Sequence, residues 1–156
     1  MKRDVRGVTV IELVVVLAIV GILSMIALPR LTSTTTTLAV RAARQEVAAS
    51  LARARALAIQ NGRPARFVRN GNLIAFAVDN SSGSSTIIGE SDLGAGHNVT
   101  VTALPTDTIV FDPRGLLVQS TLSGVPKIVV TRQGVSDSVC VLGRGKISET
   151  QCTLGL

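Results

Sequence analysis

After seven mostly polar residues the chain has a long apolar run, which is followed by shorter apolar stretches separated by polar segments. Residues 8–28 carry a single charged side chain, Glu12, and residues 13–23 carry none. A helix rises about 1.5 Å per residue, so this segment would extend about 31 Å, which matches the hydrocarbon core of a bilayer. We therefore predict a transmembrane helix at residues 8–28.

The residues on either side of this run indicate its orientation. Residues 1–7 form a short basic leader that includes Lys2, Arg3 and Arg6. Positive charge is retained on the cytoplasmic side of a membrane helix, so we predict a single-pass inner-membrane protein with a cytoplasmic N-terminus and a periplasmic C-terminal domain. A secretory signal would instead be cut after the apolar run, next to small residues, and residues 24–27 offer only a weak site of that kind.

A second helical pattern occupies residues 29–62. Its apolar side chains recur every three or four positions, as expected for one face of a helix that packs on a sheet: Val40, Ala43, Val47, Leu51, Ala54 and Ala58. Pro29 and the Thr-rich residues 32–37 are expected to bend or fray the helix. The Asn-Gly-Arg-Pro sequence at residues 61–64 is expected to end it.

The pattern changes to short β-strands in residues 63–156. Residues 65–69 and 72–78 flank Asn70-Gly71, a pair that favours a type I′ hairpin turn with two positive φ angles. Further strands are expected near residues 86–90, 98–103, 108–111, 127–131 and 137–142. We therefore predict an α+β fold, in which the second half of a long N-terminal helix packs on an antiparallel β-sheet domain.

Charge and cysteine content add two open questions. The formal net charge of +6 lies mainly on the leader and on residues 30–62, and a basic helix face is either a solvated or interface surface or a track for nucleic acid. Cys140 and Cys152 are the only cysteines. In an exported domain they would form one local disulfide, and the alternative is two free thiols.

The composition gives little basis for catalysis. His97 is the only histidine, which excludes a His-rich metal site and leaves a Ser-His-Asp triad dependent on that one residue. Its position after Gly94-Ala95-Gly96 predicts a loop residue. The Gly-rich segments lack the P-loop pattern, and the acidic residues are scattered singly. We expect no catalytic site, no cofactor and no metal site, so the protein is not expected to be an enzyme.

Residues 7–13, Gly-Val-Thr-Val-Ile-Glu-Leu, resemble the prepilin signature of type IV pilins and type II secretion pseudopilins. The resemblance implies that a prepilin peptidase cleaves between Gly7 and Val8, that Val8 is then N-methylated, and that Glu12 acts in filament assembly. Pro29 matches the helix-kinking proline of that family, whereas Val8 stands where the family usually has Phe. From the residues alone, Glu12 either lies at the headgroup level or neutralises a positive charge in an assembled bundle.

Three later segments, residues 108–115, 127–130 and 143–146, resemble the C-terminal domain of the GspH/FimT family of minor pilins and pseudopilins. This resemblance implies the type IV pilin fold. It also implies four segments along the chain. Residues 1–7 are the leader and residues 8–28 the transmembrane and filament-core helix. Residues 29–62 are the amphipathic half of the helix and residues 63–156 the periplasmic β-rich head.

The Gly143-Arg144-Gly145-Lys146 sequence is the best candidate for a binding site. In an extended strand Arg144 and Lys146 would point to the same side, and the glycines would let a phosphate approach closely. In FimT-like pilins of naturally competent bacteria the corresponding motif is associated with DNA binding, which implies that role for Gly143, Arg144 and Lys146. Lys146 replaces an Arg of that motif and would pair with phosphate as a point charge. A solvated turn is the alternative.

The resemblance as a whole implies a minor type IV pilin at or near a pilus tip, which promotes pilus assembly and binds DNA non-specifically during natural transformation. Its partners would be other major and minor pilins, the prepilin peptidase, the inner-membrane assembly platform, double-stranded DNA and, before assembly, membrane lipid. Two alternatives remain. One is a minor pseudopilin of a type II protein secretion system, and the other is a membrane-anchored periplasmic binding module that does not polymerise.

Overall fold

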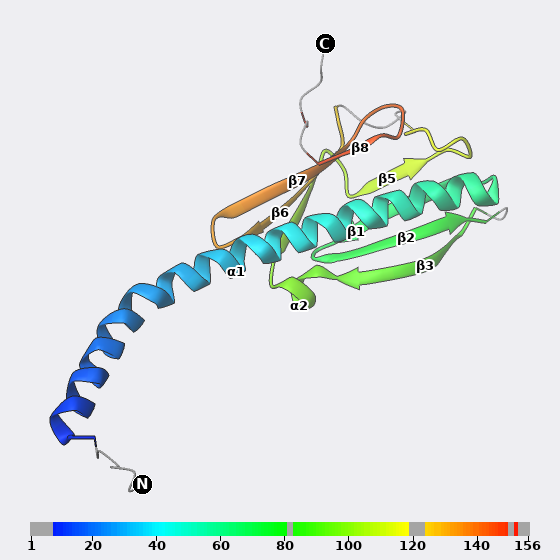
Figure 1. Ribbon diagram of the computed structural model, residues 1–156. Coiled ribbons are helices and arrows are strands. Elements are labelled where there is room, and N and C mark those ends of the chain that lie inside the picture. The colour runs from blue at the N-terminus through cyan, green and yellow to red at the C-terminus, as the bar shows by residue number, and fades with distance from the viewer. Residues whose placement is uncertain (1–7, 81–82, 119–123, 150–151, 153–156) are drawn as a thin grey trace, which may run out of the picture. The chain divides into compact units, whose positions relative to one another are not determined.

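Figure 1 shows the computed structural model of the chain, which contains one long helix, a short second helix and eight strands in the described residues. The chain divides into two compact units, Met1–Thr35 and Thr36–Leu156. For residues 26–33 only the backbone is described. The described residues are 8–80, 83–118, 124–149 and 152. The predicted leader, residues 1–7, therefore lies outside the description, and the predicted domain boundaries stay predictions.

Helix α1 (Val10–Asn61) begins with an N-cap that the sequence analysis overlooked. Thr9 Oγ1 accepts a hydrogen bond from the backbone N–H of Glu12 (3.4 Å), and Thr-x-x-Glu is the sequence pattern of a capping box. The helix ends at Asn61, as predicted. It is not interrupted at residues 32–37, so the predicted fraying is wrong. Helix propensity is a weak preference that tertiary contacts override, and Thr36 is buried and donates a hydrogen bond to Gln133 Oε1 (2.8 Å).

The N-terminal unit contributes the first part of α1. Its apolar side chains, described from Val8 to Met25, are largely exposed. Within the described residues, no helix has both the length and the apolar character needed to cross a membrane. The transmembrane assignment of residues 8–28 stays a prediction, because the side chains of residues 26–28 lie outside the description.

The C-terminal unit contains two four-stranded sheets, each of them antiparallel. The first sheet has the order β3-β2-β1-β5. Buried and partly buried residues alternate in β5 and at the start of β1, where Ala65 and Phe67 are fully buried. Its members are β1 (Ala65–Asn70), β2 (Leu73–Asp79), β3 (Ser85–Asp92) and β5 (Thr108–Phe111).

The second sheet has the order β4-β6-β7-β8, and its strands are β4 (Thr100–Leu104), β6 (Lys127–Arg132), β7 (Val135–Val141) and β8 (Ile147–Ser148). All strands predicted from the sequence are confirmed. Helix α2 (Leu93–His97) and strand β8 were missed. Both are too short to produce a hydrophobic period, and α2 depends on its caps: Asp92 accepts a hydrogen bond from the N–H of Ala95 (3.0 Å), and Asn98 is left-handed.

The β1–β2 hairpin is confirmed, but its predicted turn type is wrong. The register pairs Asn70 with Leu73, so Gly71 and Asn72 are the central residues, and of these two only Gly71 has a positive φ (61°). This pattern fits a type II′ turn. Asn72 makes a tertiary contact from this turn, because its Oδ1 accepts a hydrogen bond from the N–H of Val101 (3.0 Å).

Two consecutive positive φ angles, as a type I′ turn requires, occur instead at Gln133 (48°) and Gly134 (81°), between β6 and β7. Arg132 pairs with Val135 across this turn. The same turn supplies the hydrogen-bond partner of Thr36, so it is fixed against the helix.

The core lies between α1 and the two sheets. All six residues of the predicted helical stripe are at most 1% exposed, which confirms the stripe. They belong to one hydrophobic cluster with side chains from both sheets, including Phe67 and Phe111 of the first and Val130 and Val139 of the second. An ion pair between Arg44 and Asp137 (3.1 Å) adds a polar contact between α1 and β7.

Glu46 forms a second polar contact of α1, in this case with β3 of the first sheet and with α2, and we call it the Glu46 tie. Its Oε1 accepts a short hydrogen bond from Ser91 Oγ, and its Oε2 lies 2.9 Å from His97 Nε2. The Ser91 hydrogen bond first, and then the contacts with His97, hold the pKa of Glu46 below its usual range despite partial burial. His97 is thus the last residue of α2 and contacts the helix, which corrects the predicted loop position.

The stripe predicts a large difference between two leucines of the same helix. Leu51→Ala leaves a cavity at a fully buried site and is expected to lower the free energy of unfolding by about 2–5 kcal/mol. Leu38→Ala removes the same atoms from a side chain that is 58% exposed. This variant should change the free energy of unfolding by less than about 0.5 kcal/mol. Urea unfolding of residues 36–156, followed by circular dichroism, compares them. Similar losses for both variants would contradict this account of the core.

The Glu46 tie predicts a pH-dependent contribution to stability. Glu46→Gln is expected to lower the free energy of unfolding by about 1 kcal/mol at neutral pH. Because folding lowers the pKa of Glu46, its contribution is present above the unfolded pKa of about 4.3 and is lost as the pH falls through the folded pKa. Urea unfolding at a series of pH values should show the parent and the variant converging in acid. Glu90→Gln, on the exposed side of β3, is the control and should show no such trend; a Glu46→Gln deficit that persists at low pH would rule out the tie.

Candidate functional site

The first part of α1 presents apolar side chains around its whole circumference. Residues 13–17 are five consecutive apolar residues, each 50–62% exposed. Because successive helical residues are rotated by about 100°, these side chains cannot all lie on one face. Val8 is 74% exposed, Glu12 lies in the first turn of the helix, and Gly7 is outside the described residues. This surface can bind another apolar surface.

The predicted Gly143–Lys146 segment lies in the turn between β7 and β8. The N–H of Leu142 donates to Lys146 O (2.9 Å) and the N–H of Gly145 donates to Leu142 O (2.7 Å), while Gly145 has a φ of 73°. This is a three-residue hairpin turn with a glycine bulge. The expectation of an extended strand is therefore wrong, because the positive φ of Gly145 reverses the chain there.

A second turn with the same hydrogen-bond pattern follows β5. The N–H of Asp112 donates to Leu116 O (2.9 Å), the N–H of Gly115 donates to Asp112 O (2.8 Å), and Gly115 has a φ of 76°. Each turn therefore has an arginine immediately before its left-handed glycine, Arg114 in one and Arg144 in the other. We call residues 112–116 and 142–146 the paired turns.

The paired turns contact each other at their glycines and share a contact with α1. A Cβ atom on Gly145 would lie 2.1 Å from Gly115 O, so no side chain fits there. Arg55 Nε donates a hydrogen bond to Gly115 O (3.0 Å) and would lie 3.1 Å from a Cβ on either glycine. Arg55 thus occupies the space beside both glycines and links the paired turns to the helix.

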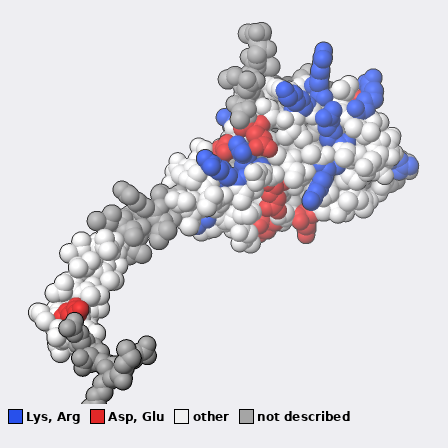
Figure 2. All heavy atoms as spheres, viewed as in Figure 1, with Lys and Arg blue, Asp and Glu red and all other residues white. Residues whose placement is uncertain are grey.

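Positive charge gathers around this contact. Figure 2 shows Lys and Arg side chains collected over the end of the C-terminal unit where Figure 1 places β5 and the β7–β8 turn. Arg144 and Lys146 are exposed, and the Arg114 side chain is 80% exposed. Among the described residues, neither Arg144 nor Lys146 forms an ion pair with an acidic side chain. These cations are therefore accessible to an anionic ligand.

Asp112 is the one acidic residue within the paired turns. Its carboxylate accepts hydrogen bonds from the N–H of Leu116 (2.8 Å) and of Arg114 (2.9 Å), and Arg114 Nε lies 3.2 Å from Oδ2. The backbone hydrogen bond from Leu116, followed by the Arg114 side chain, lowers the pKa of Asp112. Asp112 therefore stays ionised at neutral pH and orients Arg114 through Nε.

A disulfide restrains the chain beyond the β7–β8 turn. Cys140 and Cys152 are bonded, with 5.5 Å between their Cα atoms, so the predicted pairing is confirmed in the structure. The bond closes a segment of 12 residues that contains the whole turn. Closing a loop of this length stabilises a fold by about 3 kcal/mol in the chain-entropy model.

The single histidine lies in a serine–carboxylate–histidine group without catalytic geometry. Ser91 and His97 each contact a different oxygen of the Glu46 carboxylate. In a hydrolytic triad the histidine lies between the other two residues and accepts the proton of the serine. Here the carboxylate is in the middle, so this group acts as a structural tie.

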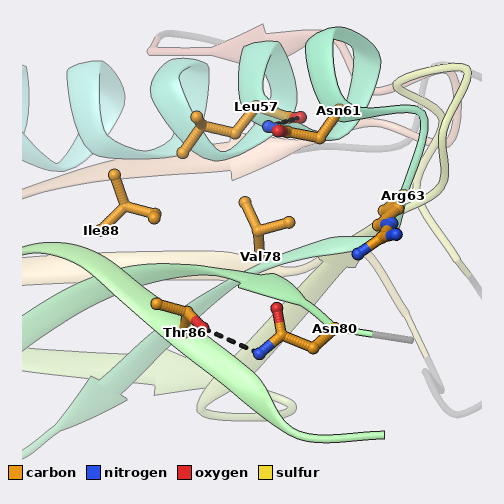
Figure 3. Close-up of a pocket in the computed structure, with 7 residues that line it drawn as sticks. All are labelled: Leu57, Asn61, Arg63, Val78, Asn80, Thr86 and Ile88. Carbon is orange, nitrogen blue, oxygen red and sulfur yellow. Dashed lines mark hydrogen bonds between the residues drawn. The ribbon is translucent and has the colours of Figure 1, made fainter. Parts of the chain in front are cut away.

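A pocket of about 530 Å³ lies between the end of α1 and the edge strand β3 (Figure 3). Leu57, Val78 and Ile88 form its apolar side, and Arg63 lies at one end. Asn80 Nδ2 donates a hydrogen bond to Thr86 Oγ1 (2.9 Å), so this amide is already engaged. The lining contains no acid, histidine or cysteine, and it includes none of the predicted site residues.

Two residues of the charged site, Arg55 and Arg114, were missed by the sequence analysis. The dipeptide Arg-Gly occurs at 114–115 and again at 144–145, and this repetition could have indicated two turns of one kind. Arg55 gave no such signal, because its role depends on the approach of distant turns to the helix. Glu12, the predicted assembly residue, lies in the N-terminal unit.

Comparisons with known proteins relate both ends of the chain to one class. The family described as Type II transport protein GspH matches residues 43–145, and the prokaryotic N-terminal methylation motif matches residues 2–28. No curated protein matched the chain.

Solved structures agree on the fold. The type IV minor pilin FimU of Pseudomonas aeruginosa aligns with a TM-score of 0.60 at 18% identity, over 72% of this chain and 89% of that chain. The minor pseudopilin EpsH from the Type 2 Secretion System of Vibrio cholerae aligns with a TM-score of 0.56 at 10% identity, over 70% of this chain and 94% of that chain. The GspH match covers most of the chain, so the protein belongs to the GspH family of minor type IV pilins and pseudopilins and has the type IV pilin fold.

Proposed function

We propose that this protein is a minor pilin that enters a type IV pilus through its N-terminal helix, lies at or near the tip and promotes assembly. The observation that carries the proposal is the apolar surface of residues 13–17, which is exposed on all sides of the helix. A helix that is apolar all round is stable only when it is covered. Membrane lipid would cover it before assembly, and the helices of other major and minor pilins afterwards.

Covering this helix supplies the driving force for assembly. Burying one Val, Leu or Ile side chain contributes about 1.5–3 kcal/mol, so the half-exposed run at residues 13–17 alone would contribute several kcal/mol in contact with neighbouring helices. Cleavage between Gly7 and Val8 by a prepilin peptidase would remove the basic leader and expose a new N-terminus for methylation. An inner-membrane assembly platform would then transfer the helix from the bilayer to the filament.

Glu12 has two separable roles in this proposal. Its backbone N–H donates a hydrogen bond to Thr9 Oγ1, and its negative charge in the first turn interacts favourably with the positive end of the helix dipole. Those contributions belong to the isolated helix. In the filament, we propose that its carboxylate neutralises the positive N-terminus of a neighbouring subunit, because an unpaired charge between apolar helices would be strongly destabilising.

Glu12→Gln keeps the capping-box pattern but removes the charge, so it abolishes the proposed pairing in the filament and costs the isolated helix only the dipole contribution of about 0.3–1 kcal/mol. We expect this variant to be made and inserted normally but to be lost from sheared filaments, since the neighbouring N-terminus would remain unpaired. Immunoblotting of the sheared and membrane fractions measures the distribution. Thr9→Ala, which removes the cap and keeps the charge, is the control and should still enter filaments. Normal incorporation of Glu12→Gln would refute the charge role.

A second role is favoured by the exposed cations of the β7–β8 turn. Arg144 and Lys146 are accessible, and the fully buried disulfide residue Cys140 restrains the strand that leads to them. We propose that this turn binds the phosphate backbone of double-stranded DNA during DNA uptake. Phosphate contacts carry no base sequence, so binding would be non-specific and strongly salt-dependent. A tip position would keep this turn clear of neighbouring heads.

Arg144→Ala combined with Lys146→Ala is expected to weaken duplex binding by at least about tenfold at about 50 mM salt, because two phosphate contacts are lost. Fluorescence anisotropy with a labelled duplex measures the affinity. Arg41→Ala with Arg53→Ala removes the same charge from exposed positions on α1 and should have a smaller effect. Equal losses for the two double variants would mean that only net charge matters.

The likeness to EpsH supports a pseudopilus as the second candidate assembly. The two assemblies use the same helix and differ in what they move. In a deletion strain, lost pilation and lost DNA uptake would support the pilus, whereas lost protein secretion with normal pilation would support the pseudopilus.

A further inference from the structure

The turn that contains Arg114 has the same architecture as the proposed DNA-binding turn and touches it. Both turns show the same pair of backbone hydrogen bonds and a left-handed glycine in the same place. Both expose an arginine at the position before that glycine, although one turn follows β5 and the other joins β7 to β8. Their sequences share little beyond the Arg-Gly pair, so the likeness is one of backbone geometry.

The contact between the turns fixes how far apart the two arginines can lie. Gly115 O and Gly145 are in direct contact, and each arginine precedes its glycine by one residue. One residue spans about 3.8 Å between Cα atoms, so the Cα atoms of Arg114 and Arg144 lie on the order of 12 Å apart or closer. Phosphates follow one another at about 3.4 Å of axial rise per strand, so two positions about 12 Å apart or closer can contact phosphates that lie within about three or four steps of one another on one backbone.

From this geometry we propose that the paired turns form a single two-armed site for the phosphate backbone of nucleic acid, with Arg114 as the second arm and Arg55 as the residue that positions both turns. The inference rests on the proposed DNA-binding function and adds a contact outside the Gly143–Lys146 motif. Arg55 does not need to touch the ligand, because its Nε is engaged by Gly115 O.

The charges around Arg114 are compatible with this role. Asp112 contacts Nε of Arg114 at 3.2 Å, and the Arg114 side chain is 80% exposed, so its terminal guanidinium nitrogens are accessible as donors. Arginine can present these two nitrogens to a phosphate as a fork. Of the nearby acids, Glu149 pairs with Arg44 at 2.9 Å and so does not neutralise the turn.

A polymer fits this site better than a single phosphate ion. The two arginines belong to separate turns, both are exposed, and the backbone of Gly115 lies directly against Gly145 between them. Two exposed arginines on turns that touch at their glycines suit a ligand that extends from Arg114 to Arg144. We therefore assign a polyanion with regularly spaced phosphates, in practice duplex DNA.

The test measures duplex affinity as a function of salt for the full chain in nonionic detergent micelles. Arg114→Ala is expected to weaken binding about tenfold at about 50 mM salt and to reduce the slope of log K against log salt by about 0.9, the value for one lost phosphate contact. Arg144→Ala should do the same. Arg114→Lys keeps the charge and should retain the slope, while Arg41→Ala should leave the slope unchanged.

The outcomes separate this inference from the function on which it rests. If Arg144→Ala with Lys146→Ala weakens binding but Arg114→Ala does not, the two-armed site is wrong and the single-turn function stands. If none of these variants weakens binding, the proposed DNA-binding function fails as well. Thermal unfolding checks that each variant is folded. Arg114→Ala is expected to be folded, because the Arg114 side chain is 80% exposed.

Two further measurements address the ligand and the positioning residue. Inorganic phosphate should compete with duplex no better than chloride at equal ionic strength, and strong competition would overturn the assignment to a polymer. Arg55→Lys lacks Nε and its hydrogen bond to Gly115 O, so it should weaken duplex binding while the salt slope stays close to that of the parent. An unchanged affinity would remove Arg55 from the site.

Discussion

The burial of one stripe of α1 against two sheets is the interaction on which the rest of this structure depends. With only three aromatic residues in the chain, the core relies on aliphatic side chains that interdigitate closely, and the stripe places Val47 and Leu51 in its centre. The same helix also carries Arg55 to the paired turns and Glu46 to α2. Arg55 and Glu46, which flank the buried stripe, thus help to fix where the paired turns and α2 lie.

Much of this fold could be predicted because the signals are local and periodic. The spacing of the stripe, the hairpin signal between β1 and β2 and the Asn-Gly-Arg-Pro stop each act within a few residues, and the stripe, the hairpin and the helix end all appear in the structure. The turn between β1 and β2 shows the limit of such signals. Asn70-Gly71 favours one turn type, but Asn72 makes tertiary hydrogen bonds and the register shifts by one residue.

The charged site was predictable only in part for a related reason. Arg144 and Lys146 could be recognised from a short motif, whereas Arg114 and Arg55 join them only because two glycines allow the backbones of separate turns to meet. Glycine in a sequence indicates freedom of the backbone but not the partner that approaches it. The disulfide was within reach of sequence analysis, since Cys140 and Cys152 are the only candidates.

The two functional surfaces place opposite demands on the same chain. In the proposed function the helix surface at residues 13–17 is covered by lipid or by other helices, and removing its apolar side chains from water lowers the free energy of the assembly. In the proposed function the paired turns would have to stay exposed to water, because Arg114 and Arg144 would gain affinity by releasing counterions from a nucleic-acid backbone. The two proposed surfaces use different residues, so covering residues 13–17 in a filament would not in itself occupy the paired turns.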